Sequence, residues 1–257
     1  MIIDSHAHYD DERFDGDREE AIALARQSGV DLIINAASDL ESSLRSVELT
    51  EKYPFFYALA GIHPHEAEKA NADEEATLSK LEDIVTGNKK VLAIGEIGLD
   101  YHYDFSPRDV QKKWFVLQME LARKLAKPVV IHSREAIAET MDVLKSFPDV
   151  IGVVHSFSGS TETLKELLKL GYYISLGGVV TFKNAKTALE VAEACPRDRL
   201  LLETDCPYLT PVPHRGERNG SHLMIHTAER ISEIRGVSLE RLFEECAENT
   251  KRIFQIT

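Results

Sequence analysis

Eight short apolar runs alternate along this chain with longer segments of helical period, and this alternation constrains the fold more than any other feature. The runs are rich in Val, Ile and Leu, which is typical of strands that are buried on both faces of a parallel sheet. The segments between them have the length and periodicity of amphipathic helices. The expected strands cover residues 2–4, 31–35, 55–60, 91–96, 128–132, 151–155, 172–176 and 200–203.

Eight strand–helix units in 257 residues match the usual size of a (β/α)8 barrel. A hydrophobic fraction of 43% supplies enough apolar side chains for a large core, and 28% charged residues is ordinary for a globular protein. We therefore predict an α/β protein that folds as a single (β/α)8 TIM-barrel domain over residues 1–257.

Local signals mark several helix ends. Ser106-Pro107-Arg108-Asp109 predicts a helix that has Ser106 as its N-cap, and Trp114 lies on the apolar face that follows. Another helix is expected to start at Ser160 and to stop before Gly171, which suits the left-handed C′ position. Two further predicted helices cover residues 221–235 and 239–254.

Charge and cysteine content exclude some classes of protein. The net charge of −13 disfavours a protein that coats duplex nucleic acid, but an enzyme that grips a strand end is compatible with it, because bound cations reverse the local sign. The odd number of cysteines, Cys195, Cys206 and Cys246, argues against a secreted disulfide framework. The sequence begins without a basic or apolar leader and has no apolar stretch of about 18 residues. We expect a cytoplasmic monomer with no membrane segment and no obligate protein partner.

Side chains of the metal-ligating kind follow the expected strands. His6 and His8 lie two residues apart after the first strand, so both imidazoles should point to the same side. By itself this pair is as compatible with two partly exposed polar residues. Other strand ends carry Glu96, His132, His155 and Asp205. Because a barrel brings these ends to one mouth, we predict that all six residues are metal ligands in one pocket.

The donor set also indicates the chemistry. Imidazole and carboxylate ligands suit Zn²⁺, Mn²⁺ and similar ions, and Glu96 is the candidate bridge between two metals about 3.5–4 Å apart. Such a pair polarises a phosphoryl oxygen and activates water, so hydrolysis is the expected reaction. We predict that Asp205 is a ligand, the base that deprotonates the water, or both. Glu203, two residues earlier, is expected to support a ligating histidine.

Six segments, in order along nearly the whole chain, resemble the TatD-type metal-dependent deoxyribonucleases, a branch of the amidohydrolase-like barrel enzymes. They are Asp4-Ser5-His6-Ala7-His8, Gly61-Ile62-His63-Pro64-His65, Gly95-Glu96-Ile97-Gly98-Leu99-Asp100-Tyr101, Ile131-His132-Ser133-Arg134, His155-Ser156-Phe157-Ser158-Gly159 and Glu203-Thr204-Asp205-Cys206-Pro207-Tyr208-Leu209. The resemblance implies a (β/α)8 barrel, two or three divalent ions of Mg, Mn or Zn at the positions above, and metal-dependent hydrolysis of DNA, with single strands trimmed from the 3′ end.

Two positions depart from the family pattern. Ser156 stands where many members have Cys after the ligating His155, and Gly220-Ser221 stands where many have Glu-Pro. The first change leaves the metal ligand intact. The second removes a proline helix start, so we expect Ser221 to serve as the N-cap instead.

Candidates for gripping substrate come from the same strand ends and from the irregular stretch 206–220. Phosphate contacts are predicted for His63, His65, Arg134, Arg215 and Arg218. The alternative is a solvated loop charge for the two residues of the 206–220 stretch and a solvent-facing side chain for His65.

Tyr101 begins an aromatic cluster with His102, Tyr103 and Phe105 that could stack on bases. A packed loop is the equally common alternative for such a cluster. Trp114, by contrast, has helical spacing and is expected in the core.

Three functions compete. We predict a divalent-metal-dependent nuclease that acts on DNA strand ends. The alternative is a small-molecule hydrolase, such as a deaminase, lactonase or phosphotriesterase, because this superfamily hosts many chemistries. Many of those enzymes carry a carboxylated Lys where this chain has Glu96. A non-catalytic metal-binding protein should show an eroded ligand set, and here all six positions hold competent residues.

Overall fold

The computed structural model describes residues 1–256, and the chain divides into two compact units. The unit that we call the terminal unit contains Met1–Asn35, Ser156–Lys169 and the described part of Tyr173–Thr257. The central unit contains Ala36–His155 and Leu170–Tyr172. The prediction of a single domain over residues 1–257 stays a prediction.

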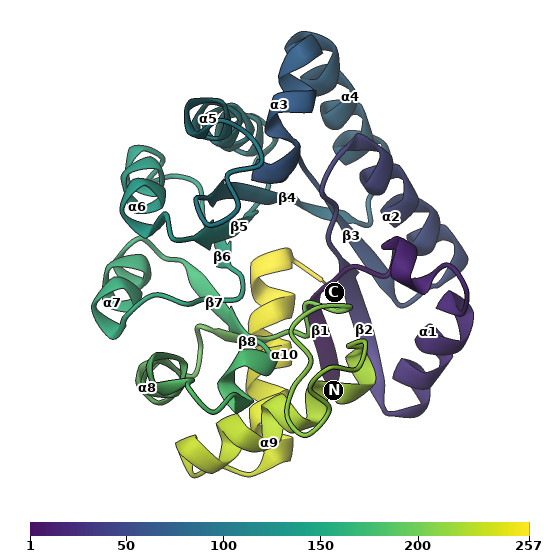
Figure 1. Ribbon diagram of the computed structural model, residues 1–257, viewed down its shortest axis with the longest axis vertical. Helices are drawn as coiled ribbons and strands as arrows, with labels where there is room; N and C mark the ends of the chain where they lie inside the picture. Colours follow the sequence, from purple (N-terminus) through teal and green to yellow (C-terminus); the bar gives the residue numbers. More distant parts are fainter. Residues whose placement is uncertain (257) are drawn as a thin grey trace. The chain divides into compact units, whose positions relative to one another are not determined.

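Eight strands form one sheet in sequence order, and at least one helix separates each strand from the next (Figure 1). The strands are β1 (Ile2–Ala7), β2 (Val30–Asn35), β3 (Phe56–Ala60), β4 (Val91–Asp100), β5 (Val129–Arg134), β6 (Gly152–Val154), β7 (Tyr173–Leu176) and β8 (Leu200–Leu202). Within the units, β1 with β2, β7 with β8, and the pairs from β3 to β6 all run parallel. The predicted (β/α)8 TIM-barrel fold is therefore confirmed.

The helices fill the predicted intervals. The α-helices are α1 (Arg18–Gln27), α2 (Leu40–Lys52), α3 (Ala67–Ala70), α4 (Glu74–Gly87), α5 (Arg108–Leu125), α6 (Ile137–Ser146), α7 (Thr161–Lys169), α8 (Lys186–Ala194), α9 (Met224–Arg235) and α10 (Leu239–Phe254). Short 3₁₀ helices are η1 (Glu12–Phe14), η2 (Pro64–Glu66), η3 (Asn71–Asp73), η4 (Gly178–Thr181) and η5 (Ser221–Leu223). Within residues 1–256, every helix is too short or too polar to cross a membrane.

In the terminal unit, α10 packs against β1 and β8 (Figure 1). Its inner face buries Leu242, Phe243 and Ile253, and burial of side chains of this size contributes about 1.5–3 kcal/mol each. The buried Asn249 amide donates to the carbonyl oxygens of Arg197 at 2.7 Å and Leu200 at 2.9 Å. The last helix is thereby fixed to the strand that leads to Glu203 and Asp205.

In the central unit, all ten residues of β4 are buried and α5 packs along the strand. Trp114 is 1% exposed, so its predicted place in the core is confirmed. Two buried glutamines of α5 bind loop backbone. Gln118 accepts from the Ile62 amide at 2.7 Å and donates to its carbonyl at 3.0 Å, and Gln111 accepts from the Asp100 amide at 2.9 Å. These bonds fix the segments that carry the histidine after β3 and the carboxylates of β4.

β4 continues four residues beyond its predicted end at Glu96. Its pairing with β5 runs on to Asp100 opposite Arg134. Gly98 permits this continuation, because its φ of +137° is rare for other residues and a Cβ there would lie 2.0 Å from the His132 carbonyl oxygen. The strand is therefore four residues longer at this end than the sequence prediction of 91–96.

Two predicted N-caps are also wrong. α5 begins at Arg108 with Pro107 as its N-cap, because Ser106 Oγ is already used: it donates to the His65 carbonyl at 2.9 Å and accepts from the Glu68 amide at 3.0 Å. Gly220, rather than Ser221, is the N-cap of η5. The Ser221 hydroxyl donates instead to the Asp4 carboxylate at 2.6 Å. Tertiary hydrogen bonds therefore replaced local caps in both places. The expected end of α7 is correct, since Gly171 has a φ of +85°.

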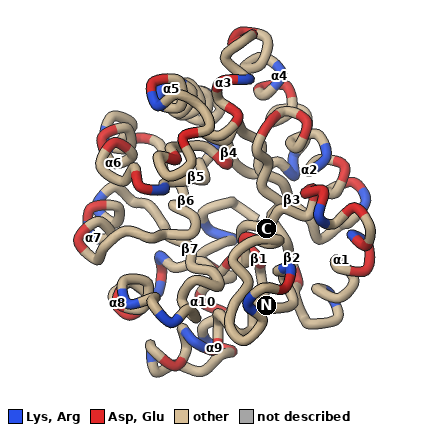
Figure 2. Tube along the Cα trace, viewed as in Figure 1, with Lys and Arg blue, Asp and Glu red and all other residues tan. Residues whose placement is uncertain are grey.

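Acidic and basic residues both occur along the helices (Figure 2). In the central unit, Lys124 of α5 lies 2.7 Å from Glu82 of α4, and Lys113 pairs with Glu74. These lysines are already paired within the unit. The charges of these two lysines are therefore balanced by acids of the same unit.

Candidate metal centre

Three histidines of the central unit converge on one carboxylate oxygen. Glu96 Oε1 lies 2.7 Å from His155 Nε2, 2.9 Å from His132 Nδ1 and 3.3 Å from His63 Nε2. Glu96, His155 and His63 are buried and His132 is half-buried. Each side chain comes from the carboxyl-terminal half of a different strand or from the residues that follow it: His63 follows β3, Glu96 lies in β4, His132 lies in β5 and His155 follows β6.

The donor atoms of this group fit a divalent cation. Ligand atoms of His63, Glu96 and His132 all lie within 4.8 Å of one another. His132 Nδ1 is also 3.2 Å from His155 Nε2, and two ring nitrogens this close cannot both point a proton at each other. At least one lone pair faces the group. A set of buried imidazole nitrogens around a carboxylate is the donor chemistry that Zn²⁺, Mn²⁺ and related ions prefer.

Burial and hydrogen bonding shift the pKa values of His63 and His132 in opposite directions. Burial lowers the pKa of His63 to about 4, although the neighbouring Glu96 acts in the opposite direction. His63 is therefore neutral near pH 7 and has a lone pair to offer. Burial would also lower the pKa of His132, but hydrogen bonds with Asp100 and Glu96 raise it above its usual value. A proton therefore competes with a cation at His132 more strongly than at His63.

Asp100 is a site residue that the sequence interpretation missed. It is fully buried, and its Oδ2 lies 3.0 Å from both His132 Nε2 and His65 Nε2. Burial alone would raise the pKa of this carboxyl, but hydrogen bonds from His132 and the Tyr103 amide hold it well below its usual value. A carboxylate behind a ligating histidine fixes the ring orientation and tautomer. The signal was present in the sequence, four residues after Glu96, but lay beyond the expected strand end.

The terminal unit holds a second group, formed by His6, His8 and Asp205. The two histidines bring their Nε2 atoms to 3.3 Å, so both rings point to one side as the alternation along β1 predicts. Asp205 Oδ1 lies 3.3 Å from His8 Nε2 and 3.8 Å from His6 Nε2. The Asp205 amide donates to the His6 carbonyl at 2.9 Å, which holds the carboxylate beside the pair.

The backbone at Asp205 is strained. Its φ is +56°, a left-handed conformation that costs a non-glycine residue of order 1–3 kcal/mol. Such residues persist where the surroundings hold them, and they cluster at functional sites. The conformation places the Asp205 side chain, 14% exposed, against the two histidines.

Two buried acids stand two residues before members of this group, Asp4 before His6 and Glu203 before Asp205. Glu203 accepts from the Ser156 amide at 2.7 Å and from the Ser175 hydroxyl. It therefore holds the residue that follows His155 in the chain, and its predicted contact with a ligating histidine stays a prediction. Asp4 accepts from Thr204 Oγ1 at 2.6 Å as well as from Ser221. Burial raises the pKa of Asp4 to about 6 despite these bonds.

The predicted substrate contacts of the central unit lie in or beside the loop that follows β4. His65 is half-buried against Asp100 instead of facing solvent. Arg134 is exposed, with its guanidinium 4.8 Å from the centre of the Tyr103 ring. Tyr101 is half-buried beneath the Arg108 guanidinium, which lies 4.2 Å from its ring centre. The aromatic face that is open to solvent therefore belongs to later residues of the same loop.

The predicted contacts of the terminal unit are occupied by protein groups. Arg218 makes two short bonds to the Asp17 carboxylate, at 2.7 and 2.6 Å, and its charge is thereby paired. Arg215 donates to the Thr210 carbonyl at 2.8 Å and lies 3.9 Å from the centre of the Phe182 ring. Phosphate binding by these two residues stays a prediction.

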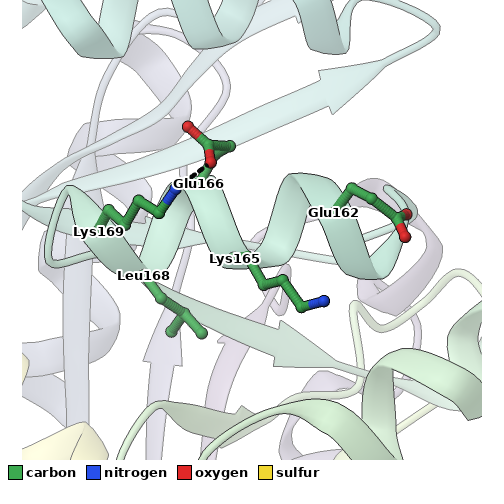
Figure 3. A pocket seen from close by; sticks show the side chains of 5 residues that line it. All are labelled: Glu162, Lys165, Glu166, Leu168 and Lys169. Carbon is green, nitrogen blue, oxygen red and sulfur yellow. Dashed lines mark hydrogen bonds and ion pairs between the residues drawn. The ribbon is translucent and has the colours of Figure 1, made fainter.

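A depression on α7 is a different kind of feature (Figure 3). It is lined by Glu162, Lys165, Glu166, Leu168 and Lys169. Lys169 lies 2.6 Å from Glu166, and every lining residue comes from one surface helix. Its lining shares no residue with either histidine group, so we do not place the active site there.

Comparison with known proteins shows which family the chain resembles. A family model described as "TatD related DNase" matches residues 3–255. The Bacillus subtilis (strain 168) protein named "Uncharacterized metal-dependent hydrolase YabD" is 42% identical over 100% of both chains. The "3'-5' ssDNA/RNA exonuclease TatD" of Dickeya dadantii (strain 3937) is 35% identical over 95% of this chain and 94% of its own length. The crystal structure of YjjV, a TatD homologue from Escherichia coli K12, superposes with a TM-score of 0.92 at 32% identity and covers 100% of this chain and 98% of that one.

Proposed function

Because this chain belongs to the TatD family of metal-dependent hydrolases, we propose that it is a nuclease that cleaves phosphodiester bonds at single-stranded DNA ends, working from the 3′ end. The observation that carries the proposal is the convergence of three imidazoles on the Glu96 carboxylate at 2.7–3.3 Å. The name of the Dickeya dadantii relative supports the choice of substrate and direction.

The proposed ligands of two or three Mg, Mn or Zn ions are Glu96, His132 and His155 in the central unit and His6, His8 and Asp205 in the terminal unit. That the two groups serve one centre is a prediction of the strand-end argument. Divalent cations bound by such ligands polarise a phosphoryl group and lower the pKa of water.

The chain's own residues supply the remaining functions. Asp205 is the proposed general base, since its carboxylate is partly exposed and can accept the proton of an attacking water. Asp100 orients His132 through the 3.0 Å contact with Nε2, and Glu203 holds the backbone after His155. Arg134, exposed two residues after His132, offers a fixed cation to a phosphate oxygen.

A substrate panel tests this function. Chelator-treated protein is supplied with Mg²⁺, Mn²⁺ or Zn²⁺ and given labelled single-stranded DNA, duplex DNA, RNA and small esters, lactones and amides. We expect metal-dependent turnover that is fastest on single-stranded DNA. Turnover of a small ester or amide with none on any nucleic acid would reject the proposal and favour the small-molecule alternative.

Matched variants locate the activity. Asp205→Asn should lose at least about 100-fold in kcat, since a general base contributes about 10²–10⁴-fold. Asp198→Asn, an exposed acid of the same unit, should retain wild-type turnover. Equal rates for the two variants would remove Asp205 from its assigned role.

A further inference from the structure

The loop after β4 presents two stacked aromatic rings to solvent. Tyr103 is 48% exposed and Phe105 is 63% exposed, which makes Phe105 the most exposed of the large hydrophobic side chains within residues 1–256. Their ring centres are 5.1 Å apart and their planes differ by 16°. Two exposed rings in stacked contact form an apolar patch, and an exposed apolar patch on a globular protein commonly marks a binding site. We call Tyr103 and Phe105 the aromatic platform.

Hydrogen bonds hold the backbone of the loop that carries the platform. Asp100 Oδ1 accepts from the amides of His102 at 3.0 Å and Tyr103 at 2.9 Å. At the other end of the loop, the Arg108 guanidinium clamps Asp104 with bonds of 2.9 and 2.7 Å. A fixed ring loses little conformational entropy when a ligand stacks on it. The rings are therefore prepared for contact before any ligand arrives.

The same residues tie the platform to the metal centre. Asp100 holds the loop with Oδ1 and contacts His132 with Oδ2 at 3.0 Å. His65, on the other side of Asp100, places its ring edge-on to Phe105, with ring centres 4.8 Å apart. The aromatic platform thus lies one contact away from the histidines that converge on Glu96.

Arg134 adds a positive charge over one face of the Tyr103 ring, which leaves the more exposed Phe105 as the ring that can offer a face to a base. Its guanidinium lies 4.8 Å from the Tyr103 ring centre, and the side chain is exposed. An exposed aromatic ring close to an exposed cation matches the two parts of an unpaired nucleotide, whose base stacks on a ring and whose phosphate pairs with Arg. A base inside a duplex has no free face to offer, so this recognition selects single strands.

We propose that the aromatic platform is a subsite on which an unpaired nucleobase of single-stranded nucleic acid stacks next to the bond to be cleaved. The inference rests on the proposed nuclease function and deepens it, since it assigns the single-strand preference to Tyr103 and Phe105. It also assigns base stacking to Tyr103 and Phe105 rather than to Tyr101, because the Tyr101 ring lies beneath the Arg108 guanidinium. Base stacking on an aromatic side chain changes affinity by about 5- to 100-fold when the ring is removed.

The test is a double-mutant cycle in which a change to the enzyme is combined with a change to the oligonucleotide. Binding of labelled oligonucleotides is measured by fluorescence anisotropy with Mn²⁺ on the Asp205→Asn background, so that substrate is not consumed. Intact single strands are compared with strands in which one of the terminal nucleotides is abasic. The ring variants are Phe105→Leu and Tyr103→Leu. Phe55→Leu removes a half-buried ring just before β3, at the opposite strand end of the same unit, and is the control.

We expect each ring variant to weaken binding of the intact strand by about 5- to 100-fold. The strand that is abasic at the stacked position should already bind wild-type rings weakly and lose less than about two-fold more in the variants, because the base and the ring report one interaction. A 2-aminopurine at that position should be quenched on binding and regain emission in Phe105→Leu. The Phe55→Leu control should bind both strands as tightly as the protein with all its rings does.

Equal weakening of intact and abasic strands by the ring variants, or no weakening at all, would overturn the platform. Its failure can be told from failure of the nuclease proposal, since wild-type hydrolysis is assayed separately. Hydrolysis without base-dependent binding rejects the platform alone. Base-dependent binding without hydrolysis on any nucleic acid rejects the nuclease alone.

Discussion

Replacing Asp100 by Asn should weaken the metal centre without unfolding the protein. The carboxylate contacts the rings of His132 and His65 through one oxygen and two loop amides through the other. An Asn side chain keeps an oxygen for the loop amides, but turns an NH₂ group toward two imidazoles. A hydrogen bond to a charged group contributes about 1.5–3 kcal/mol. Losing one such bond at His132 corresponds to about 10- to 100-fold in metal affinity, which is the usual effect of removing a carboxylate behind a ligating histidine.

The assay for Asp100→Asn is isothermal titration of the chelator-treated protein with Mn²⁺ or Zn²⁺, beside the metal concentration that gives half-maximal turnover. Asp149→Asn removes an exposed acid of the same unit and should behave as wild type. The Tm should fall by about 3–12 °C, since the lost bond contributes about 1.5–3 kcal/mol and each kcal/mol shifts Tm by ~2–4 °C in a chain of this size. Unchanged metal affinity in Asp100→Asn would refute the assigned role. A protein that fails to fold would show that the residue is chiefly structural.

Three further predictions concern stability and reactivity. Gly98→Ala should lower Tm far more than Gly16→Ala, because the added Cβ would lie 2.0 Å from the His132 carbonyl oxygen while Gly16 has open space; equal Tm values would contradict the tight β4–β5 approach. Burial raises the pKa of the Cys195 thiol to about 12, and it also raises the pKa values of the Cys206 and Cys246 thiols. A thiol reagent should therefore modify these three cysteines slowly in the native state and rapidly in guanidinium. Fast labelling of the native protein would contradict their burial. Burial would raise the pKa of the Asp39 carboxyl, but hydrogen bonds from Ser42 hold it below its usual value, so its stabilisation is present above the unfolded pKa of about 4 and is lost as pH falls through the folded pKa. Asp39→Ala should therefore cost about 0.5–2 kcal/mol at pH 7 and less at pH 3 by urea denaturation, and an equal cost at both pH values would contradict this.

Periodicity and strand-end residues predicted much of the structure. Alternation of apolar runs and helical segments gave the eight strands, because burial on both faces imposes a pattern that neighbouring elements do not alter. The proximity of Glu96, His132 and His155 could be predicted because each lies in or directly after an apolar run, and the parallel topology of the central unit brings these segments together, while their role as metal ligands stays a prediction.

Long-range contacts explain the features of the site that the sequence did not predict. Asp100 was missed because Gly98 allows β4 to continue past Glu96, and that depends on the close approach of the β5 backbone. His63 was expected to contact phosphate alone, yet it lies 3.3 Å from Glu96, since Gln118 of α5 fixes the preceding residue. Partners distant in sequence decide both positions, and local patterns carry no information about them.

The measurement that tests the central claim most directly is digestion of 5′-labelled single-stranded DNA by wild type and by Glu96→Ala, with added divalent metal and with chelator. The account predicts a ladder that shortens from the 3′ end, requires metal, and disappears in Glu96→Ala. A ladder that persists in chelator or in Glu96→Ala would contradict it, as would a metal-loaded wild-type protein that leaves every nucleic acid intact.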